Sequence, residues 1–181
     1  MAAVDNDDVS GYYRQEQNFF SYSPFAVKAD FGGHDNQAFG NVYGYLAMTA
    51  WFDGPAAIWC TWGAQLPGHE LVFVGNTVVQ DWCHDGPWPG AAYTCESNFT
   101  IGATCGGAAV PGATVMANNS YFLPLDAAHP AASVVECGVP MAQYQASCPT
   151  CDPGSVALAF PEDDAIFALA RAALGMPPAG E

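Results

Sequence analysis

Residues 71–80 read Leu-Val-Phe-Val-Gly-Asn-Thr-Val-Val-Gln and carry the clearest local fold signal in the chain. Two apolar, largely β-branched runs, 71–74 and 77–80, flank Gly75-Asn76. Glycine readily takes the positive φ that a type II′ turn needs at its first central position, so the pattern predicts a two-residue β-hairpin. Both faces of this hairpin would be largely apolar, which is typical of strands inside a two-layer structure.

A second hairpin is predicted upstream, where residues 41–52 and 57–62 flank the turn Asp53-Gly54-Pro55-Ala56. Side chains alternate between the two faces of a strand, so Leu46 and Trp59 would share a core face. Tyr45, Trp51 and Trp62 would share the opposite face, which must either pack beneath another sheet or meet a ligand. All five tryptophans fall between residues 51 and 88, so this aromatic stretch is expected to form the centre of the fold.

The remaining segments favour short strands bounded by Gly, Pro and Asn. Strands are predicted in residues 18–27, broken at Pro24, and in residues 98–103, 114–117, 121–125, 133–139 and 155–160. One helix is predicted over residues 162–174, because Pro161 and three acids begin it, apolar residues recur at helical spacing and Gly175 ends it. The predicted fold is mainly β: an antiparallel β-sandwich or β-barrel with one C-terminal α-helix, stapled by disulfides.

The length of 181 residues indicates one domain. Residues 1–11 are expected to form a flexible acidic N-terminal tail, because they are polar and lack periodicity. Residues 12–176 are expected to form a single β domain ending in the helix 162–174, and residues 177–181 a flexible C-terminal tail. We find no internal repeat beyond Asp-Gly-Pro at 53–55 and 85–87, which turn chemistry alone explains.

The formal net charge of −15 comes from a shortage of basic residues, since 18 acids face only Arg14, Lys28 and Arg171. Proteins that bind phosphate backbones or anionic membranes need several Lys or Arg, so neither nucleic acid nor an anionic membrane surface is expected as a partner. The uncharged run 97–125 contains Asn, Pro and Gly and is not expected to span a membrane.

The cysteines indicate an oxidising compartment. All seven are disulfide candidates, and the odd count leaves at least one unpaired or paired between chains: Cys60, Cys83, Cys95, Cys105, Cys137, Cys148 and Cys151. Asn98-Phe-Thr and Asn118-Asn-Ser are N-glycosylation sequons, which together with scattered cysteines predict a secreted glycoprotein. Cys148-Pro-Thr-Cys151 has redox spacing, but it precedes a loop and is interpreted as structural.

No metal or other cofactor is expected. His34-Asp35, His69-Glu70 and Cys83-His84-Asp85 are donor pairs, but neighbouring residues on a strand point to opposite faces and seldom chelate one ion. The chain has no Gly-x-Ser-x-Gly elbow for a nucleophile. A pair of carboxylates for hydrolysis is still possible, because such a pair depends only on spatial separation; the candidates are Asp53, Glu70, Asp81, Asp85, Glu96 and Glu136.

The aromatic residues suggest a binding function. Residues 81–90 combine two Trp, His84 and Asp85 with two Pro and two Gly, and the ring of Trp88 is held between Pro87 and Pro89. Aromatic rings offer flat faces to the C–H side of sugars, although tryptophans more often belong to a core. The predicted ligand-binding residues are Trp88, His84, Asp85, Trp62, Trp51 and Tyr45.

Three functions follow from these observations as hypotheses. The leading one is a secreted, non-enzymatic binding or effector protein that recognises an extracellular glycan or protein surface. The second is a secreted acid glycoside hydrolase that uses a carboxylate pair. The third is a structural subunit of an extracellular assembly, with the odd cysteine bridging two chains.

Overall fold

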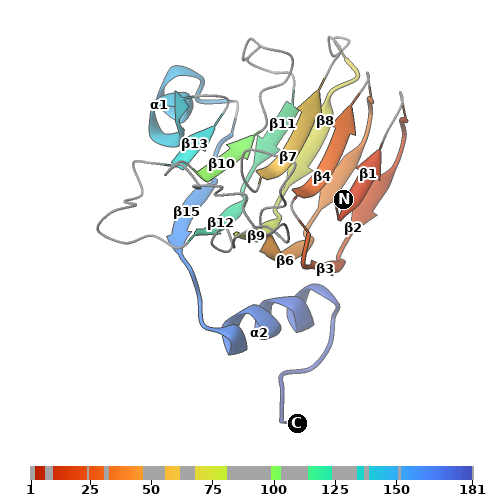
Figure 1. Ribbon diagram of the computed structural model, residues 1–181, viewed down its shortest axis with the longest axis vertical. Coiled ribbons are helices and arrows are strands. Elements are labelled where there is room, and N and C mark those ends of the chain that lie inside the picture. Colours follow the sequence, from red (N-terminus) through yellow and green to blue (C-terminus); the bar gives the residue numbers. More distant parts are fainter. Residues whose placement is uncertain are drawn as a thin grey trace, which may run out of the picture.

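The computed structural model describes residues 3–6, 10–23, 25–30, 33–46, 56–61, 68–80, 99–102, 114–123, 134–136, 139–150 and 152–180. The chain winds repeatedly through three sheets, and we call each pass a coil (Figure 1). The strands of the five coils, in chain order, are β1 (Val4–Asn6), β2 (Arg14–Glu16) and β3 (Phe19–Ser21); β4 (Phe25–Asp30), β5 (Gln37–Phe39) and β6 (Val42–Leu46); β7 (Ala56–Thr61), β8 (Leu71–Val74) and β9 (Thr77–Gln80); β10 (Phe99–Gly102), β11 (Thr114–Ala117) and β12 (Ser120–Leu123); and β13 (Val134–Glu136), β14 (Val139–Pro140) and β15 (Val156–Ala159).

Each strand except β14 pairs with the strands in the same position of the neighbouring coils, and β14 pairs with β13 of its own coil. The orders are β1-β4-β7-β10-β13-β14 in a six-stranded sheet, β11-β8-β5-β2 in a four-stranded sheet and β15-β12-β9-β6-β3 in a five-stranded sheet. The four- and five-stranded sheets are entirely parallel, and among the described strands only the β13–β14 pair is antiparallel. This winding is that of a parallel β-helix, in which stacked coils share one continuous core.

The predicted antiparallel sandwich or barrel is therefore wrong. β8 and β9 lie close to where the sequence predicts them, yet they do not pair with each other: β8 pairs with β5 and β11, and β9 with β6 and β12. The hairpin predicted over 41–62 fails in the same way, because β6 belongs to the five-stranded sheet and β7 to the six-stranded one. Residues 4–6, which the sequence assigned to a solvated tail, form β1 on β4.

Two helices accompany the parallel sheets, in an α/β-like combination, but neither links two strands of one sheet. Helix α1 (Met141–Ser147) contacts β13 and β14. Helix α2 (Asp163–Ala173) lies where the sequence predicts a helix. It contacts β6 and is drawn below the sheets in Figure 1. Asp163 and Asp164 stand in its first turn, where carboxylates interact favourably with the helix dipole, and Ile166 and Ala170 are buried.

The three corners of the coil are named here by their residues. The asparagine corner directly precedes each strand of the five-stranded sheet and contains residues 17–18, 40–41, 75–76, 118–119 and 154–155. The tyrosine corner follows the five-stranded sheet and contains Tyr22 and Tyr45. The histidine corner precedes the four-stranded sheet and contains residues 10–13, 33–36 and 68–70.

Equivalent positions at the asparagine corner repeat the same backbone conformation. The first residue has a positive φ in all five coils, at Gln17, Gly40, Gly75, Asn118 and Gly154. The second is an asparagine in the first four coils, and Asn41, Asn76 and Asn119 are no more than 1% exposed. Their amides bond from coil to coil, which satisfies polar groups that would otherwise be buried without partners.

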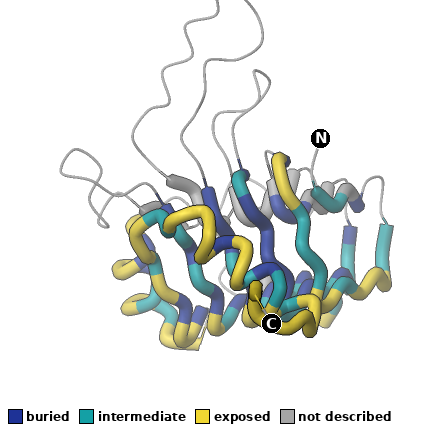
Figure 2. The backbone as a smooth tube through the Cα atoms, turned by 90° about the horizontal axis from the view of Figure 1, so that it is seen from below, coloured by how far each residue is buried: buried dark blue, intermediate teal, exposed yellow. Residues whose placement is uncertain are grey.

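The interior is filled by stacked apolar residues of successive coils. Tyr43 lies between Phe20 and Phe73, with ring centroids 5.3 and 5.8 Å away. Leu46, Val78, Tyr121 and Leu123 are completely buried beside this stack. Figure 2 shows the described strands largely as buried or intermediate segments, with exposed turns at the rim. The stacking of like positions buries a continuous core, although no coil has one alone.

Candidate functional site

The histidine corner brings together two imidazoles and a carboxylate. Nδ1 of His34 lies 2.8 Å from Oδ2 of Asp35, and Nδ1 of His69 lies 2.7 Å from the same oxygen. The two imidazole rings meet edge to face, with centroids 5.8 Å apart. With a proton on each Nδ1, both imidazoles donate to one carboxylate oxygen.

The backbone explains why these side chains meet. Asp35 has a φ of 55°, a left-handed conformation that aspartate tolerates better than most residues. Its N–H donates to the carbonyl of His69 at 3.2 Å, which fixes coil three against coil two at this point. Since Gln37 pairs with Val72 in the adjacent strands, His34 and His69 occupy equivalent positions in the two coils.

The ring of His34 is also fixed from the preceding coil. Tyr12 packs edge-on against it, with centroids 5.3 Å apart and planes at 88°. A Cβ on Gly11 would lie 2.8 Å from Cε1 and 2.9 Å from the carbonyl oxygen of His34, so the close approach of these coils requires glycine.

The electrostatics of the corner favour ionised carboxylates. Hydrogen bonds from His34 and then His69 lower the pKa of Asp35 below its ordinary value. The pKa of Glu70 is also lowered, chiefly because the backbone N–H of Gly68 donates to its carboxylate at 2.7 Å. Both groups therefore remain charged in weak acid.

The tyrosine corner holds an exposed aromatic stack. Tyr22 and Tyr45 lie 5.2 Å apart between ring centroids, with planes only 7° from parallel. Both have positive φ values, 60° and 55°, and the N–H of Tyr22 donates to the carbonyl of Gly44. Tyr22 is 78% exposed, so the hydrophobic effect does not explain its position.

Helix α2 supports this stack from the side. The Tyr45 hydroxyl donates to Oδ1 of Asp163 at 2.7 Å. Ile166, three residues after Asp163 on the helix, is fully buried. It faces Gly44: a Cβ added to Gly44 would lie 3.6 Å from the Cγ2 of Ile166. The C-terminal helix thus returns to the second coil and fixes the tyrosine beneath Tyr22.

Among the predicted ligand-binding residues, only Tyr45 has a described side chain. It lies at the end of β6 in the five-stranded sheet, not on a pleated face shared with a partner strand of a hairpin. Trp51, Trp62, His84, Asp85 and Trp88 lie outside the described residues. The side chains of the carboxylate candidates are also undescribed, Glu70 excepted.

The predicted modification sites are described only in part. Among the described side chains Cys148 is the one cysteine, and it is disulfide-bonded. Cys148 follows α1, so the Cys-x-x-Cys spacing does not open a helix there. Asn118 is exposed at the asparagine corner, whereas Asn98 is not described. Glycosylation and multiple disulfides stay predictions.

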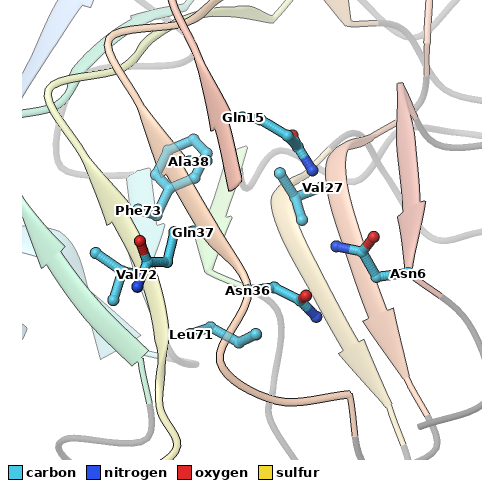
Figure 3. Close-up of a pocket in the computed structure, with 9 residues that line it drawn as sticks. All are labelled: Asn6, Gln15, Val27, Asn36, Gln37, Ala38, Leu71, Val72 and Phe73. Atoms are coloured by element: carbon cyan, nitrogen blue, oxygen red, sulfur yellow. The ribbon is translucent and has the colours of Figure 1, made fainter. Parts of the chain in front are cut away.

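A small hollow lies inside the first coils, between the six- and four-stranded sheets (Figure 3). Its lining includes Asn6, Gln15, Asn36 and Val27. Asn6 Nδ2 and Gln15 Oε1 are buried there without a protein partner. The space holds about one water molecule, which could bridge these two groups but leaves no room for a larger ligand.

The sequence does not predict the convergence of His34, Asp35 and His69, because each donor pair was weighed by itself and residues 32–36 read only as a loop. The two histidines are 35 positions apart, and only the stacking of coils makes them neighbours. A signal was present: His69 precedes Leu71-Val72 at the same distance as His34 precedes Asn36-Gln37. This equal spacing indicates that the two histidines are neighbours only once the register between the coils is known.

Comparisons with known proteins give no family for this chain. It matches no family model, and neither a curated protein nor a solved structure is significantly similar to it. In the part of the chain that the structure describes, neither helix is long and apolar enough to cross a membrane.

Proposed function

We propose that this chain is a secreted, non-enzymatic protein that binds a neutral extracellular glycan at the tyrosine corner. The observation that carries the proposal is the ring of Tyr22, 78% exposed and stacked on Tyr45. A tyrosine held flat by a second ring offers its outer face to solvent without having to become ordered on binding. This arrangement reduces the entropic cost of binding.

The chemistry of the corner suits a sugar ring. An aromatic face carries partial negative charge and attracts the weakly positive C–H groups of a pyranose, in addition to covering apolar surface. Asp163 and Asp164 begin α2 beside Tyr45 and can accept hydrogen bonds from sugar hydroxyls. Both features are needed, since the aromatic face supplies affinity and the carboxylates supply orientation.

The net charge restricts the type of glycan. A protein with a charge of −15 repels polyanions such as uronic acid polymers, especially at low salt. A neutral polymer pays no such electrostatic cost. The single disulfide-bonded cysteine that is described supports an oxidising, extracellular compartment.

The acid hydrolase alternative lacks a comparable observation among the described residues. A general acid needs a carboxyl with a raised pKa, whereas the pKa values of Asp35 and Glu70 are lowered. A carboxylate pair in the undescribed segments would reveal itself by release of reducing sugars from polysaccharides at about pH 4–5.

Binding to a panel of neutral polysaccharides tests the proposal. The full chain is run through native gels containing cellulose derivatives, β-glucan, mannan, xylan or soluble chitin, and we expect at least one to retard it. Tyr22→Ala should weaken that binding about fivefold, because a stacked ring contributes about 1 kcal/mol. Tyr13→Ala is the matched control, since Tyr13 is 55% exposed but lies at the histidine corner. No retardation by any polymer, or equal binding by Tyr22→Ala, would overturn the proposal.

A further inference from the structure

The histidine corner contains the donor atoms of a three-ligand metal site. A nitrogen of each imidazole and one carboxylate oxygen, from His34, Asp35 and His69, lie within 4.8 Å of one another. We propose that this corner binds a divalent transition-metal ion, with Zn²⁺ as the representative case, through two imidazoles and one carboxylate. This inference is independent of the proposed glycan site, which lies at another corner of the coil.

The distances are close to those that a metal requires. Tetrahedral zinc with bonds of about 2.0–2.1 Å separates its ligand atoms by about 3.3 Å. The two nitrogen–oxygen contacts at 2.7 and 2.8 Å therefore need to open by about half an ångström. Small side-chain rotations achieve this, because the contacts are hydrogen bonds between side-chain ends.

Accessibility favours an ion that keeps one open position. The side chains of His34, Asp35 and His69 are 24%, 23% and 45% exposed. An ion can enter directly from solvent, and water can complete a tetrahedral shell. Sites with three protein ligands and one water are the usual form of open zinc sites.

The donor types select the metal. Imidazole nitrogen suits Zn²⁺, Cu²⁺, Ni²⁺ and Co²⁺, whereas Ca²⁺ and Mg²⁺ prefer shells made entirely of oxygen. Asp35 supplies the one carboxylate ligand of the site. Glu70 is held by the Gly68 N–H, so it is not assigned as a ligand.

The surroundings hold the ligands in place before the ion arrives. Tyr12 packs against the His34 ring, and Gly11 allows that ring to approach the first coil. The Asp35 N–H bonds to the His69 carbonyl, so the backbones of two ligands are joined. Preorganisation of this kind raises metal affinity, because fewer side chains lose freedom on binding.

The test is equilibrium dialysis of Zn²⁺ against the full chain, without an affinity tag, after EDTA treatment and with free thiols blocked. The chain has two further histidines, so the double variant His84→Gln/His129→Gln serves as the background. We expect one Zn²⁺ per chain in this background, and no competition from Mg²⁺ or Ca²⁺. Substitution of Co²⁺ should give the visible absorption bands of a tetrahedral site.

Two variants and one control locate the ion. Asp35→Asn, which keeps a residue that tolerates positive φ, and His69→Gln should each raise the Kd at least about tenfold. Glu70→Gln is the control: like Asp35→Asn it removes one negative charge, but Glu70 lies in the next coil and is not a ligand. The Kd of this variant for Zn²⁺ should stay close to that of the background protein. Circular dichroism without metal checks folding; if Asp35→Asn does not fold, the more exposed His69→Gln decides the result.

Two outcomes would overturn the assignment. One is the absence of stoichiometric Zn²⁺ binding in the background protein. The other is binding that persists in His69→Gln or that falls equally in Glu70→Gln, which would indicate a general attraction to negative charge. Thermal melts give an independent readout, since an ion that binds only the folded chain raises the Tm of the background protein but not that of His69→Gln.

Discussion

Asn41 donates two hydrogen bonds to a single atom of Asn76, from its backbone N–H at 3.0 Å and from its side-chain amide at 3.1 Å. The two residues are 35 positions apart and occupy the asparagine corner of successive coils. Asn18 makes the same two contacts with Asn41, and Asn76 with Asn119. The corner therefore fixes the register of one coil on the next.

Asn76→Ala is expected to lower the free energy of unfolding by about 2–4 kcal/mol, because it leaves buried donors of Asn41 and the carbonyl of Ala38 without partners. Chemical denaturation measures the loss. Asn18→Ala should cost less, since Asn18 lies at the end of the ladder and the Oδ1 of Asn41 still accepts the backbone N–H of residue 18. Equal losses of unfolding free energy in the two variants would contradict the role assigned to the asparagine hydrogen bonds between coils.

The sequence predicted most of the elements but not their pairing. Gly75 does have the positive φ that its neighbours suggested, 66°. A positive φ serves equally in a hairpin turn and at a corner between two sheets, so local chemistry could not separate the two folds. The partners of β9 are residues of β6 and β12, 35 and 43 positions away from the matching residues of β9.

The repeat was hidden for a related reason. A residue with positive φ followed by asparagine recurs at 17–18, 40–41, 75–76 and 118–119, each time before a strand. The intervals of 23, 35 and 43 residues differ because the other parts of the coils differ in length. No fixed period exists to be found. The C-terminal helix was predictable because its signals are local.

Gly40→Ala tests the backbone conformation of the asparagine corner. Gly40 has a φ of 58° and an added Cβ would contact nothing within 4 Å, so the expected loss of about 1–2 kcal/mol is conformational alone. Gly40→Asn should cost less, because Asn118 takes this conformation in the fourth coil. Gly154→Ala should cost more than Gly40→Ala, since its Cβ would also clash with the Asn118 side chain. Melting temperatures that rank the variants differently would contradict the assignment.

Acidification is expected to destabilise the histidine corner. The folded chain lowers the pKa of Asp35 from 3.8 and that of Glu70 from 4.5, so protons bind the unfolded chain more readily. The two ionised carboxylates stabilise the folded chain fully at a pH above these ordinary pKa values. This stabilisation is lost as the pH falls through their lowered pKa values in the folded chain. NMR titration of the Asp35 carboxyl carbon measures the pKa directly; a value at or above 3.8 in metal-free protein would contradict the hydrogen-bond geometry.

Ile166→Ala is expected to loosen α2 from the coils. The side chain is fully buried against Gly44 and Phe19 lies beside the same glycine, so truncation should cost about 2–4 kcal/mol. Phe167→Ala is the matched control on the same helix, because Phe167 is 52% exposed and should cost far less. Urea denaturation compares them, and similar losses would contradict the docking of α2.

Detachment of α2 should also affect the tyrosine corner. Tyr45 is held from the side by Asp163, so Asp163→Asn keeps an acceptor whereas Asp163→Ala removes it. We expect Asp163→Ala, but not Asp163→Asn, to broaden the ring signals of Tyr45 in NMR spectra. Unchanged ring signals in both variants would show that the helix does not position the stack.

The most direct test of the account is where a bound glycan touches the protein. NMR spectra of the labelled chain, titrated with a soluble fragment of a neutral polysaccharide that it binds, should show intermolecular NOEs from sugar C–H groups to the ring of Tyr22. Signals of Tyr13, exposed at the histidine corner, should not move. Saturable binding with no change at Tyr22 or Tyr45 would contradict the proposal that the stacked tyrosines form the binding site.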